Sequence, residues 1–209
     1  MSIVHEVAHP LIQHHLATLR DKSTPPDEFR RLVQRLAVLL AYEATRDLDT
    51  EACEVETPLT RTTARRLSQR IGLVPILRAG LGMVDPLLDL LPEAEVWHLG
   101  LYRDEATARP VEYYSKLPDH SPVDVALILD PMLATGGSVI AALQALRRWG
   151  VPKVKVLSLI AAPEGISNVT AACPEAQLFV CAIDRELNSR KFIVPGLGDA
   201  GDRSFNTVP

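Results

Sequence analysis

The chain has 209 residues, of which 47% are hydrophobic, so it is long enough to bury the core of one domain. Lys and Arg number 22 against 26 Asp and Glu, and the net charge of -4 argues against a general nucleic-acid binder, although a local basic patch is compatible with it. No apolar run is long enough to span a bilayer, and the three cysteines show no zinc spacing. These features predict a single domain over residues 1–209 in the cytoplasm, with no membrane and no nucleic-acid partner.

The N-terminal part is predicted to be helical, and it contains His5, His9, His14 and His15. His5 and His9 are four residues apart, a spacing that places two side chains on one helix face. A metal site needs further ligands beside them. We therefore interpret these histidines as surface or interface residues, with a metal site as the alternative.

An apolar stripe of helical period follows the break at Pro25-Pro26. Such a stripe indicates a core or dimer contact rather than a cofactor site. Its members are Phe29, Leu32, Val33, Leu36, Leu39 and Leu40.

Residues 53–70 have a different pattern. Cys53 to Leu59 alternates in polarity, which is typical of an edge strand or an arm. Thr60 to Arg70 is basic and polar, so we interpret it as a solvated face. A phosphate or regulatory-nucleotide site is the alternative for its arginines.

Residues 73–91 are predicted to form a strand, a loop and a helix. Leu73 to Leu77 is apolar, the loop is Arg78-Ala79-Gly80-Leu81-Gly82, and Met83 to Leu91 has helical spacing. A lone arginine at a strand end is usually a surface ion pair. The glycines, however, let a ligand approach the backbone, and a guanidinium binds phosphate oxygens in a bidentate way. Arg78 is therefore a candidate phosphate ligand.

A polar insertion from Arg103 to Pro110 lies between two predicted strands, Val96 to Leu101 and Val111 to Leu117. Long polar insertions between sheet strands are usually functional or flexible. The sequence predicts a hairpin here.

The most informative unit spans Val125 to Leu146. A buried strand is expected to stop at Asp130, and a loop of small residues then leads into a helix. A helix start leaves backbone N–H groups free, and its dipole favours an anion, while Thr135 and Ser138 add hydroxyl donors. Asp130 is placed to face sugar hydroxyls or a metal. Gly-Gly before a helix is often only a tight turn, and the loop has neither the Walker lysine nor the dinucleotide GxGxxG pattern.

The rest of the chain continues this alternation. Strands are predicted at Lys153 to Ile160 and Gln177 to Ile183, with a helix at Ile166 to Ala172 between them. Alternating strands and helices predict an α/β fold with a mostly parallel sheet flanked by helices. In such sheets the ligand lies beyond the carboxyl ends of the strands. The Gly-rich stretch from Phe192 to Arg203, taken alone, is an ordinary loop.

Taken together, three strings resemble the uracil branch of the type I phosphoribosyltransferase family. They are DPMLATGGS at 130–138, PILRAGLG at 75–82 and IVPGLGDAGDR at 193–203. In the resemblance these are the loop for phosphoribosyl diphosphate (PRPP), the pyrophosphate loop and the uracil loop. Many type I members carry two adjacent acids in the first loop, and Pro131 replaces the second one here, as in the uracil branch. The resemblance runs over essentially the whole chain.

The resemblance implies the type I phosphoribosyltransferase fold with a hairpin hood over the active site, and the conversion of uracil and PRPP into UMP and diphosphate. Mg²⁺ is implied as the cofactor, carried mainly by PRPP without a dedicated protein site. A cis or strained peptide is expected between Arg78 and Ala79. The implied catalytic residues are Arg78, Arg103, Asp130 and Asp199. The implied PRPP ligands are Arg78, Arg103, Asp199 and the loop Asp130, Pro131, Met132, Leu133, Ala134, Thr135, Gly136, Gly137 and Ser138. The implied uracil ligands are Ile193, Gly198, Asp199 and Ala200.

Three alternatives stay open: an RNA-binding regulator that kept the fold, a phosphoribosyltransferase for another base, and a binding module without turnover. The acidic charge and the uracil loop argue against the first, and the same loop argues against purines. Some relatives are activated by GTP, so GTP is a candidate effector. The apolar helical stripes favour a homo-oligomer, as a dimer or tetramer.

Overall fold

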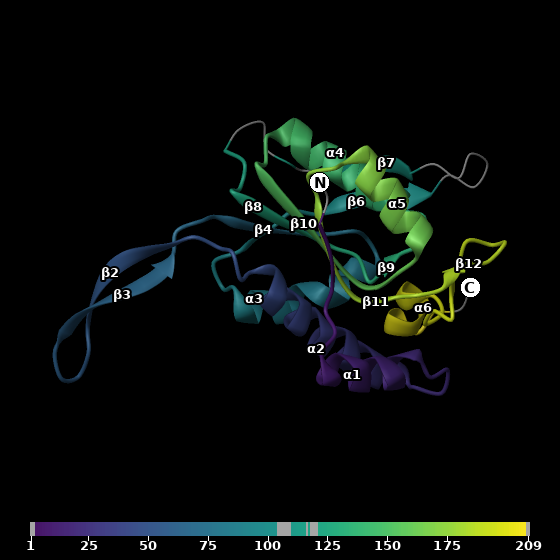
Figure 1. Ribbon diagram of the computed structural model, residues 1–209, viewed down its shortest axis with the longest axis horizontal. Coiled ribbons are helices and arrows are strands. Elements are labelled where there is room, and N and C mark those ends of the chain that lie inside the picture. Colours follow the sequence, from purple (N-terminus) through teal and green to yellow (C-terminus); the bar gives the residue numbers. More distant parts are fainter. Residues whose placement is uncertain (1–2, 104–109, 116, 118–120, 208–209) are drawn as a thin grey trace.

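The computed structural model describes residues 3–103, 110–115, 117 and 121–207. Its centre is a seven-stranded sheet in the order β1-β11-β10-β8-β4-β5, with β9 pairing beside β10 (Figure 1). Every pairing in this sheet is parallel. The strands are β1 (Ile3–Glu6), β4 (Ile71–Pro75), β5 (Glu95–Val96), β8 (Val125–Leu129), β9 (Met132–Leu133), β10 (Lys153–Ala161) and β11 (Gln177–Ile183).

Helices cover both faces of the sheet (Figure 1). On one side lie α4 (Gly137–Trp149) and α5 (Pro163–Ala172), and on the other lie α1 (Pro10–Arg20), α2 (Pro26–Ala44) and α3 (Val84–Leu90). A hydrophobic core lies on each face of the sheet, and alternate residues of β8 belong to one or the other. Leu127 packs toward α2 and Ile128 toward α4. A strand buried on both faces needs a continuous apolar run, which explains the sequence VALIL. The predicted fold class is confirmed.

The N-terminal prediction was partly wrong, because residues 3–6 form a strand rather than a helix. β1 pairs with β11 in parallel, so tertiary pairing with a free sheet edge outweighs the local helical preference. His5 stacks on Phe179 with ring centroids 4.6 Å apart. His9 precedes α1, and its Nδ1 accepts the Leu11 N–H at 3.1 Å. The two histidines therefore share no helix face, and no three potential metal-ligating side chains cluster within the described residues.

The apolar stripe on α2 lies in the core, as predicted. Five of its members are buried and Leu39 packs against them. The buried ones are Phe29, Leu32, Val33, Leu36 and Leu40. Within the described part of the chain, no helix is long and apolar enough to cross a membrane.

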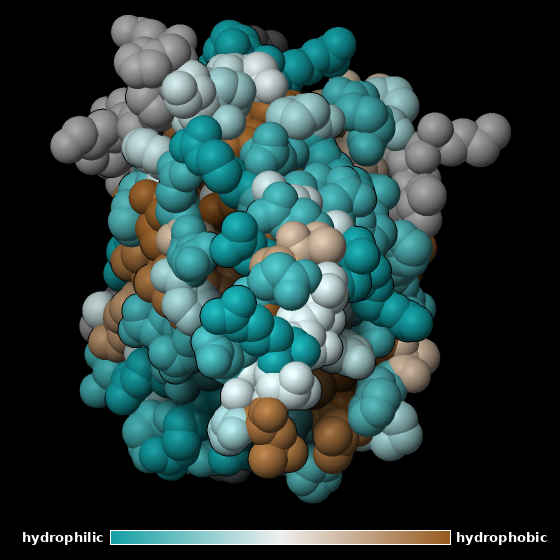
Figure 2. All heavy atoms as spheres, turned by 90° about the vertical axis from the view of Figure 1, so that its left-hand side faces the viewer, coloured by the Kyte–Doolittle hydropathy of each residue, from teal (hydrophilic) through white to brown (hydrophobic). Residues whose placement is uncertain are grey.

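Strands β2 (Thr50–Glu56) and β3 (Arg61–Leu67) form an antiparallel arm that projects from the body (Figure 1). Both strands are exposed at almost every position. Figure 2 looks onto this side and shows a mainly hydrophilic surface with separated hydrophobic groups. Arg66 pairs with Glu51 at 3.0 Å, and Arg61 lies 3.8 Å from Glu56. The basic stretch thus lies on a solvated arm, where acids of the partner strand face its arginines.

The strand expected at residues 96–101 is split in two. β5 belongs to the sheet, whereas β6 (Leu99–Arg103) leaves it and pairs antiparallel with β7 (Pro110–Ser115). This hairpin packs on α4. The predicted tip at residues 104–109 lies outside the described residues. A second small pair joins β12 (Glu186–Leu187) to β13 (Ile193–Val194), and a short helix α6 (Ala200–Phe205) follows.

Candidate active site

The candidate site lies at the carboxyl edge of the sheet. β4, β8, β10 and β11 run parallel, so all four end at the same edge. Pro75 of β4 is in register with Leu129 of β8, which brings the segments after these strands side by side. Arg78 follows β4, Asp130 follows β8 and Asp184 follows β11. The structure therefore places Asp130 and Arg78 at the edge where the sequence predicted them.

The main chain of the loop between β8 and α4 is held at two points. β9 pairs with the end of β10, and the Thr135 carbonyl accepts a hydrogen bond from Asn168 Nδ2 at 3.0 Å. Gly136, with φ of 81°, precedes α4, which begins two residues earlier than its first apolar residue. Among the described residues, no side chain caps this helix. The first N–H groups of α4 are thus available to an anion.

Asp130 is a partly buried carboxyl at the start of this loop. Burial raises its pKa to about 7, although the Met132 N–H, which donates to Oδ1 at 3.3 Å, acts in the opposite direction. A carboxyl with this pKa is half protonated near neutral pH. It takes on its charge most readily when a ligand supplies hydroxyl donors or a cation.

The Arg78 loop packs through its backbone against Leu129, the last residue of β8 and the residue before Asp130. A Cβ at Gly80 would lie 2.3 Å from the Leu129 carbonyl oxygen, so only glycine permits this approach. The loop continues as a 3₁₀ helix, η1 (Ala79–Met83), and α3 begins at Val84. The cis peptide bond joins Leu77 to Arg78, one bond before the predicted position, because the chain turns before Arg78 and that residue already has helical dihedrals.

The Arg78 side chain lies against the C-terminal acids. Its Nη2 is 3.2 Å from Asp202 Oδ1. Asp199 caps α6 by accepting the Asp202 N–H at 2.9 Å. Gly201 lies between them, because its Cβ position would be 3.2 Å from Asp199 Oδ1 and 3.7 Å from Arg78 Nη2. The structure thus brings together Arg78 and Asp199, which the sequence named, and Asp202, which it missed although Asp202 is the second acid of the same Gly-rich string.

The predicted uracil loop begins at β13 and ends at α6. Ile193 and Ala200 are buried, whereas Gly198 is exposed. Val194–Pro195 is a cis peptide bond, and both Gly196 and Gly198 have positive φ. Sequence reasoning missed three residues that hold this loop, namely Arg20, Asp184 and Arg203. The available signal was that Asp184 follows a buried strand, just as Asp130 does.

Arg103 is the one predicted site residue whose side chain lies outside the described part. Its backbone ends β6 and pairs with Pro110 of β7. Its predicted contact with pyrophosphate therefore stays a prediction.

Comparison with known proteins agrees with this architecture. The family model described as uracil phosphoribosyltransferase matches residues 6–207. A uracil phosphoribosyltransferase of Symbiobacterium thermophilum is 56% identical over 208 residues, which are 99% of this chain and 100% of that protein. One from Roseiflexus sp. (strain RS-1) is 56% identical over 199 residues, 95% of this chain and 96% of that protein.

A solved structure has the same fold. The AQ2163 protein from Aquifex aeolicus superposes with a TM-score of 0.92 at 39% identity, covering 97% of this chain and 98% of that one. The family model and the Symbiobacterium relative both extend over the two loops at the sheet edge and over the C-terminal loop. The chain belongs to the uracil phosphoribosyltransferase family.

Proposed function

We propose that this protein transfers the phosphoribosyl group of PRPP to N1 of uracil, giving UMP and diphosphate. The observation that carries the proposal is that two loops follow adjacent strands, one with Asp130 and the uncapped start of α4, the other with Arg78, and that the second packs on Leu129 directly before Asp130. A ligand with a phosphate group at each end suits such a pair of loops. The names of the relatives support uracil as the acceptor.

The roles follow from the donors at hand. The first N–H groups of α4, with the hydroxyls of Thr135 and Ser138, bind the 5′-phosphate. Arg78 and Arg103 bind the diphosphate, and Asp130 accepts hydrogen bonds from the ribose hydroxyls. The bond from N1 to ribose C1 forms as the bond from C1 to the diphosphate oxygen breaks, and the N1 proton passes to water or to the departing diphosphate. The positive charge that develops on the ribose is met by charges already in place.

The base is read by the loop at residues 193–200. Backbone groups of Ile193, Gly198 and Ala200 face the uracil edge in this proposal, and Asp199 helps to orient the ligands. An N–H that points at O4 accepts uracil and opposes the amino group of cytosine. Two buried donors facing each other cost about 1–3 kcal/mol.

The residues present fit Mg²⁺ only as a partner of PRPP. Asp130 is a single carboxyl at the loop, Pro131 takes the place of a second acid, and the described residues contain no cluster of three ligating side chains. Such an ion is usually held by one or two carboxylates together with substrate phosphates. When bound, it neutralises charge on the departing diphosphate. Activation by GTP, a homo-oligomeric state and a cytoplasmic location stay predictions.

The test is diphosphate release from PRPP and Mg²⁺ with uracil, cytosine, hypoxanthine or orotate added singly. We expect release with uracil alone, and we expect Asp130→Asn to abolish it. Asp85→Asn, which changes an exposed carboxyl on α3, is the matched control and keeps full activity. No release with any base from a folded protein that still binds UMP would overturn the proposal and favour the RNA-binding regulator.

A further inference from the structure

A mostly buried ion pair lies directly beneath the proposed uracil loop. Arg20 ends α1, and Asp184 follows β11, 164 residues later in the chain. The two side chains pair in a bidentate way, with Nη1 to Oδ2 at 2.8 Å and Nη2 to Oδ1 at 2.6 Å. The Asp184 side chain is only 4% exposed. Two parallel bonds fix the relative orientation of the guanidinium and the carboxylate.

This pair binds both polar backbone groups of Gly196. Asp184 Oδ2 accepts the Gly196 N–H at 2.9 Å, and Arg20 Nη1 donates to the Gly196 carbonyl at 2.8 Å. The two charged side chains thus satisfy the N–H and the carbonyl of Gly196, as a neighbouring strand does for a residue within a sheet. We call this arrangement of Arg20, Asp184 and Gly196 the loop clamp.

The loop clamp acts at the point where the loop reverses direction. Gly196 has φ of 66°, and a Cβ there would lie 2.2 Å from the Ile193 carbonyl oxygen. The turn therefore folds back tightly on Ile193 and leads to Gly198 and Ala200. These three residues are the ones that the proposed function assigns to base recognition. Fixing Gly196 fixes the spacing between them.

A second arginine holds the next residue of the loop. Arg203 Nη1 donates to the Leu197 carbonyl at 2.7 Å and to the Leu19 carbonyl at 2.8 Å. Its guanidinium also lies 4.3 Å from the centre of the Phe29 ring. Both arginines thus connect the loop to the end of α1.

We infer that Arg20 and Asp184 are positioning residues for base selection, acting through Gly196 without touching the base. The inference rests on the proposed function. A base that is read by backbone groups cannot be discriminated by a loop that shifts, because donors and acceptors must stay within hydrogen-bond distance. Removing the guanidinium also leaves the Asp184 carboxylate buried without its partner, which drives the loop to rearrange.

The experiment compares Arg20→Met, Arg20→Lys and Asp184→Asn with wild type. Steady-state kinetics give KM for uracil and KM for PRPP separately, and calorimetry gives the affinities for UMP and ribose 5-phosphate. Arg31→Met is the matched control, because Arg31 makes an exposed ion pair with Asp27 on α2. Far-UV circular dichroism confirms that each variant folds.

We expect Arg20→Met to raise KM for uracil about tenfold or more, with less than about a twofold change in KM for PRPP, since only base recognition loses its support. UMP binding weakens by a similar factor, ribose 5-phosphate binding stays unchanged, and cytosine is rejected less well. Arg20→Lys keeps a charge beside Asp184 but not the bidentate geometry, so its KM for uracil and its UMP affinity lie between those of wild type and Arg20→Met. If Arg20→Met does not fold, Arg20→Lys and Asp184→Asn carry the test.

Equal changes in the two KM values, or unchanged base selection and UMP binding in folded variants, would overturn the inference. The failure of the proposed function looks different. In that case the wild-type protein itself releases no diphosphate with any base, whatever the variants do.

Discussion

Arg78 and Asp202 form an ion pair, with Nη2 3.2 Å from Oδ1, although 124 residues separate them in the chain. The pair joins the proposed pyrophosphate loop to the C-terminal segment. The Arg78 side chain is 60% exposed, and ion pairs of this kind stabilise a fold by only about 0–1 kcal/mol. A diphosphate can therefore take the place of Asp202 at little cost.

Arg78→Met tests this arginine as a ligand rather than a structural residue. We expect the free energy of unfolding to change by less than about 1 kcal/mol. KM for PRPP rises about tenfold or more, because a bidentate phosphate contact is lost. Arg78→Lys keeps the charge but not the bidentate guanidinium geometry, so we expect its KM for PRPP to lie between those of wild type and Arg78→Met. Urea unfolding and initial rates measure both effects, and a large loss of stability with normal KM for PRPP would contradict the assignment.

Asp130 makes the stability of the free protein depend on pH. Its pKa is raised from 3.8 to about 7, so between these values the folded protein binds more protons than the unfolded chain. The contribution of Asp130 to the free energy of unfolding therefore falls as pH rises through this window, and it is constant above pH 7. Asp130→Asn loses this slope and is more stable than wild type at pH 8 by about 1–3 kcal/mol.

Urea midpoints at several pH values between about 4 and 8 check this prediction. The difference between Asp130→Asn and wild type shrinks toward the acid end of the series. Asp85→Asn is the control and keeps the wild-type slope. A parallel pH dependence in Asp130→Asn and wild type would show that Asp130 is not the responsible group.

Gly80→Ala is predicted to move the Arg78 loop away from Leu129 and so from the other proposed phosphate-binding loop. Its Cβ would meet the Leu129 carbonyl oxygen at 2.3 Å, so the backbone must shift. Gly82→Ala is a matched control in the same loop, because its Cβ meets only the Val33 side chain at 3.5 Å. We expect Gly80→Ala to lower both thermal stability and kcat/KM for PRPP, while Gly82→Ala stays close to wild type in both. Equal effects of the two changes would argue against the loop contact.

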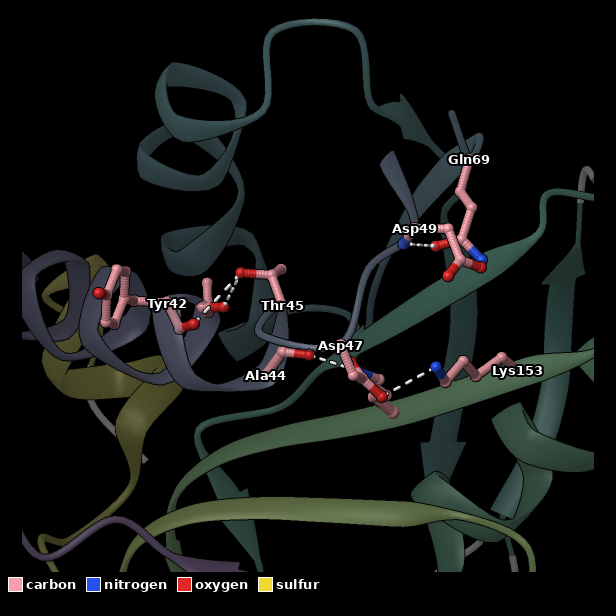
Figure 3. A network of polar contacts seen from close by, with 9 residues as sticks. Tyr42, Ala44, Thr45, Asp47, Asp49, Gln69 and Lys153 are labelled. Atoms are coloured by element: carbon pink, nitrogen blue, oxygen red, sulfur yellow. Dashed lines mark hydrogen bonds and ion pairs between the residues drawn. The ribbon is translucent and has the colours of Figure 1, made fainter. Parts of the chain in front are cut away.

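A polar network between α2 and β10 carries a fourth prediction. Figure 3 shows Asp47 pointing toward Lys153, with Nζ to Oδ2 at 2.8 Å. Asp47 also pairs with Lys155, whose buried ammonium donates to the Ala44 carbonyl. Burial pushes the pKa of Asp47 upward, but hydrogen bonds from the two lysines outweigh it and lower the pKa to about 2. Burial lowers the pKa of Lys155, and Asp47 opposes that change.

Asp47→Ala leaves the Lys155 ammonium buried without a carboxylate. Losing one partner of a buried pair costs about 3–5 kcal/mol, and we expect the lower end here because Asp47 is itself half exposed. Lys155→Met removes the buried charge and costs less, and Lys153→Met costs least. Urea unfolding at pH 7 ranks the three variants. The stabilisation by Asp47 is present above its unfolded pKa of 3.8 and is lost as pH falls toward 2, so Asp47→Ala and wild type converge in acid.

Local sequence patterns were sufficient for the central strands of the sheet and for the positions of Asp130 and Arg78 after β8 and β4. The buried runs at Val125–Leu129 and Gln177–Ile183 were located to the residue, because such strands have no polar face. Because these strands are parallel, the segments that follow them were correctly expected at the same edge of the sheet. The edge strand β1 was missed, since its polarity differs little from that of a helix and only its neighbour β11 selects the extended form.

The loop clamp was not predictable from local patterns. Arg20 and Asp184 are 164 residues apart, and each has an ordinary local context. Their pairing depends on how α1 packs against the end of β11, which is a property of the assembled core. Asp202 was missed for a related reason, because its partner Arg78 lies in the loop after β4, 124 residues earlier in the chain.

The backbone contact between Gly80 and Leu129 fixes the distance between the Arg78 loop and the end of β8. Main-chain atoms meet there, because the atoms nearest to the Gly80 Cβ position belong to the backbone of Leu129 and Pro75. In the proposed function, this contact sets the distance between the groups that bind the two anionic ends of the phosphoribosyl donor. On that proposal, a change of acceptor base would involve the C-terminal loop, whereas a change of phosphoribosyl donor would also have to alter the main-chain contact between Gly80 and Leu129.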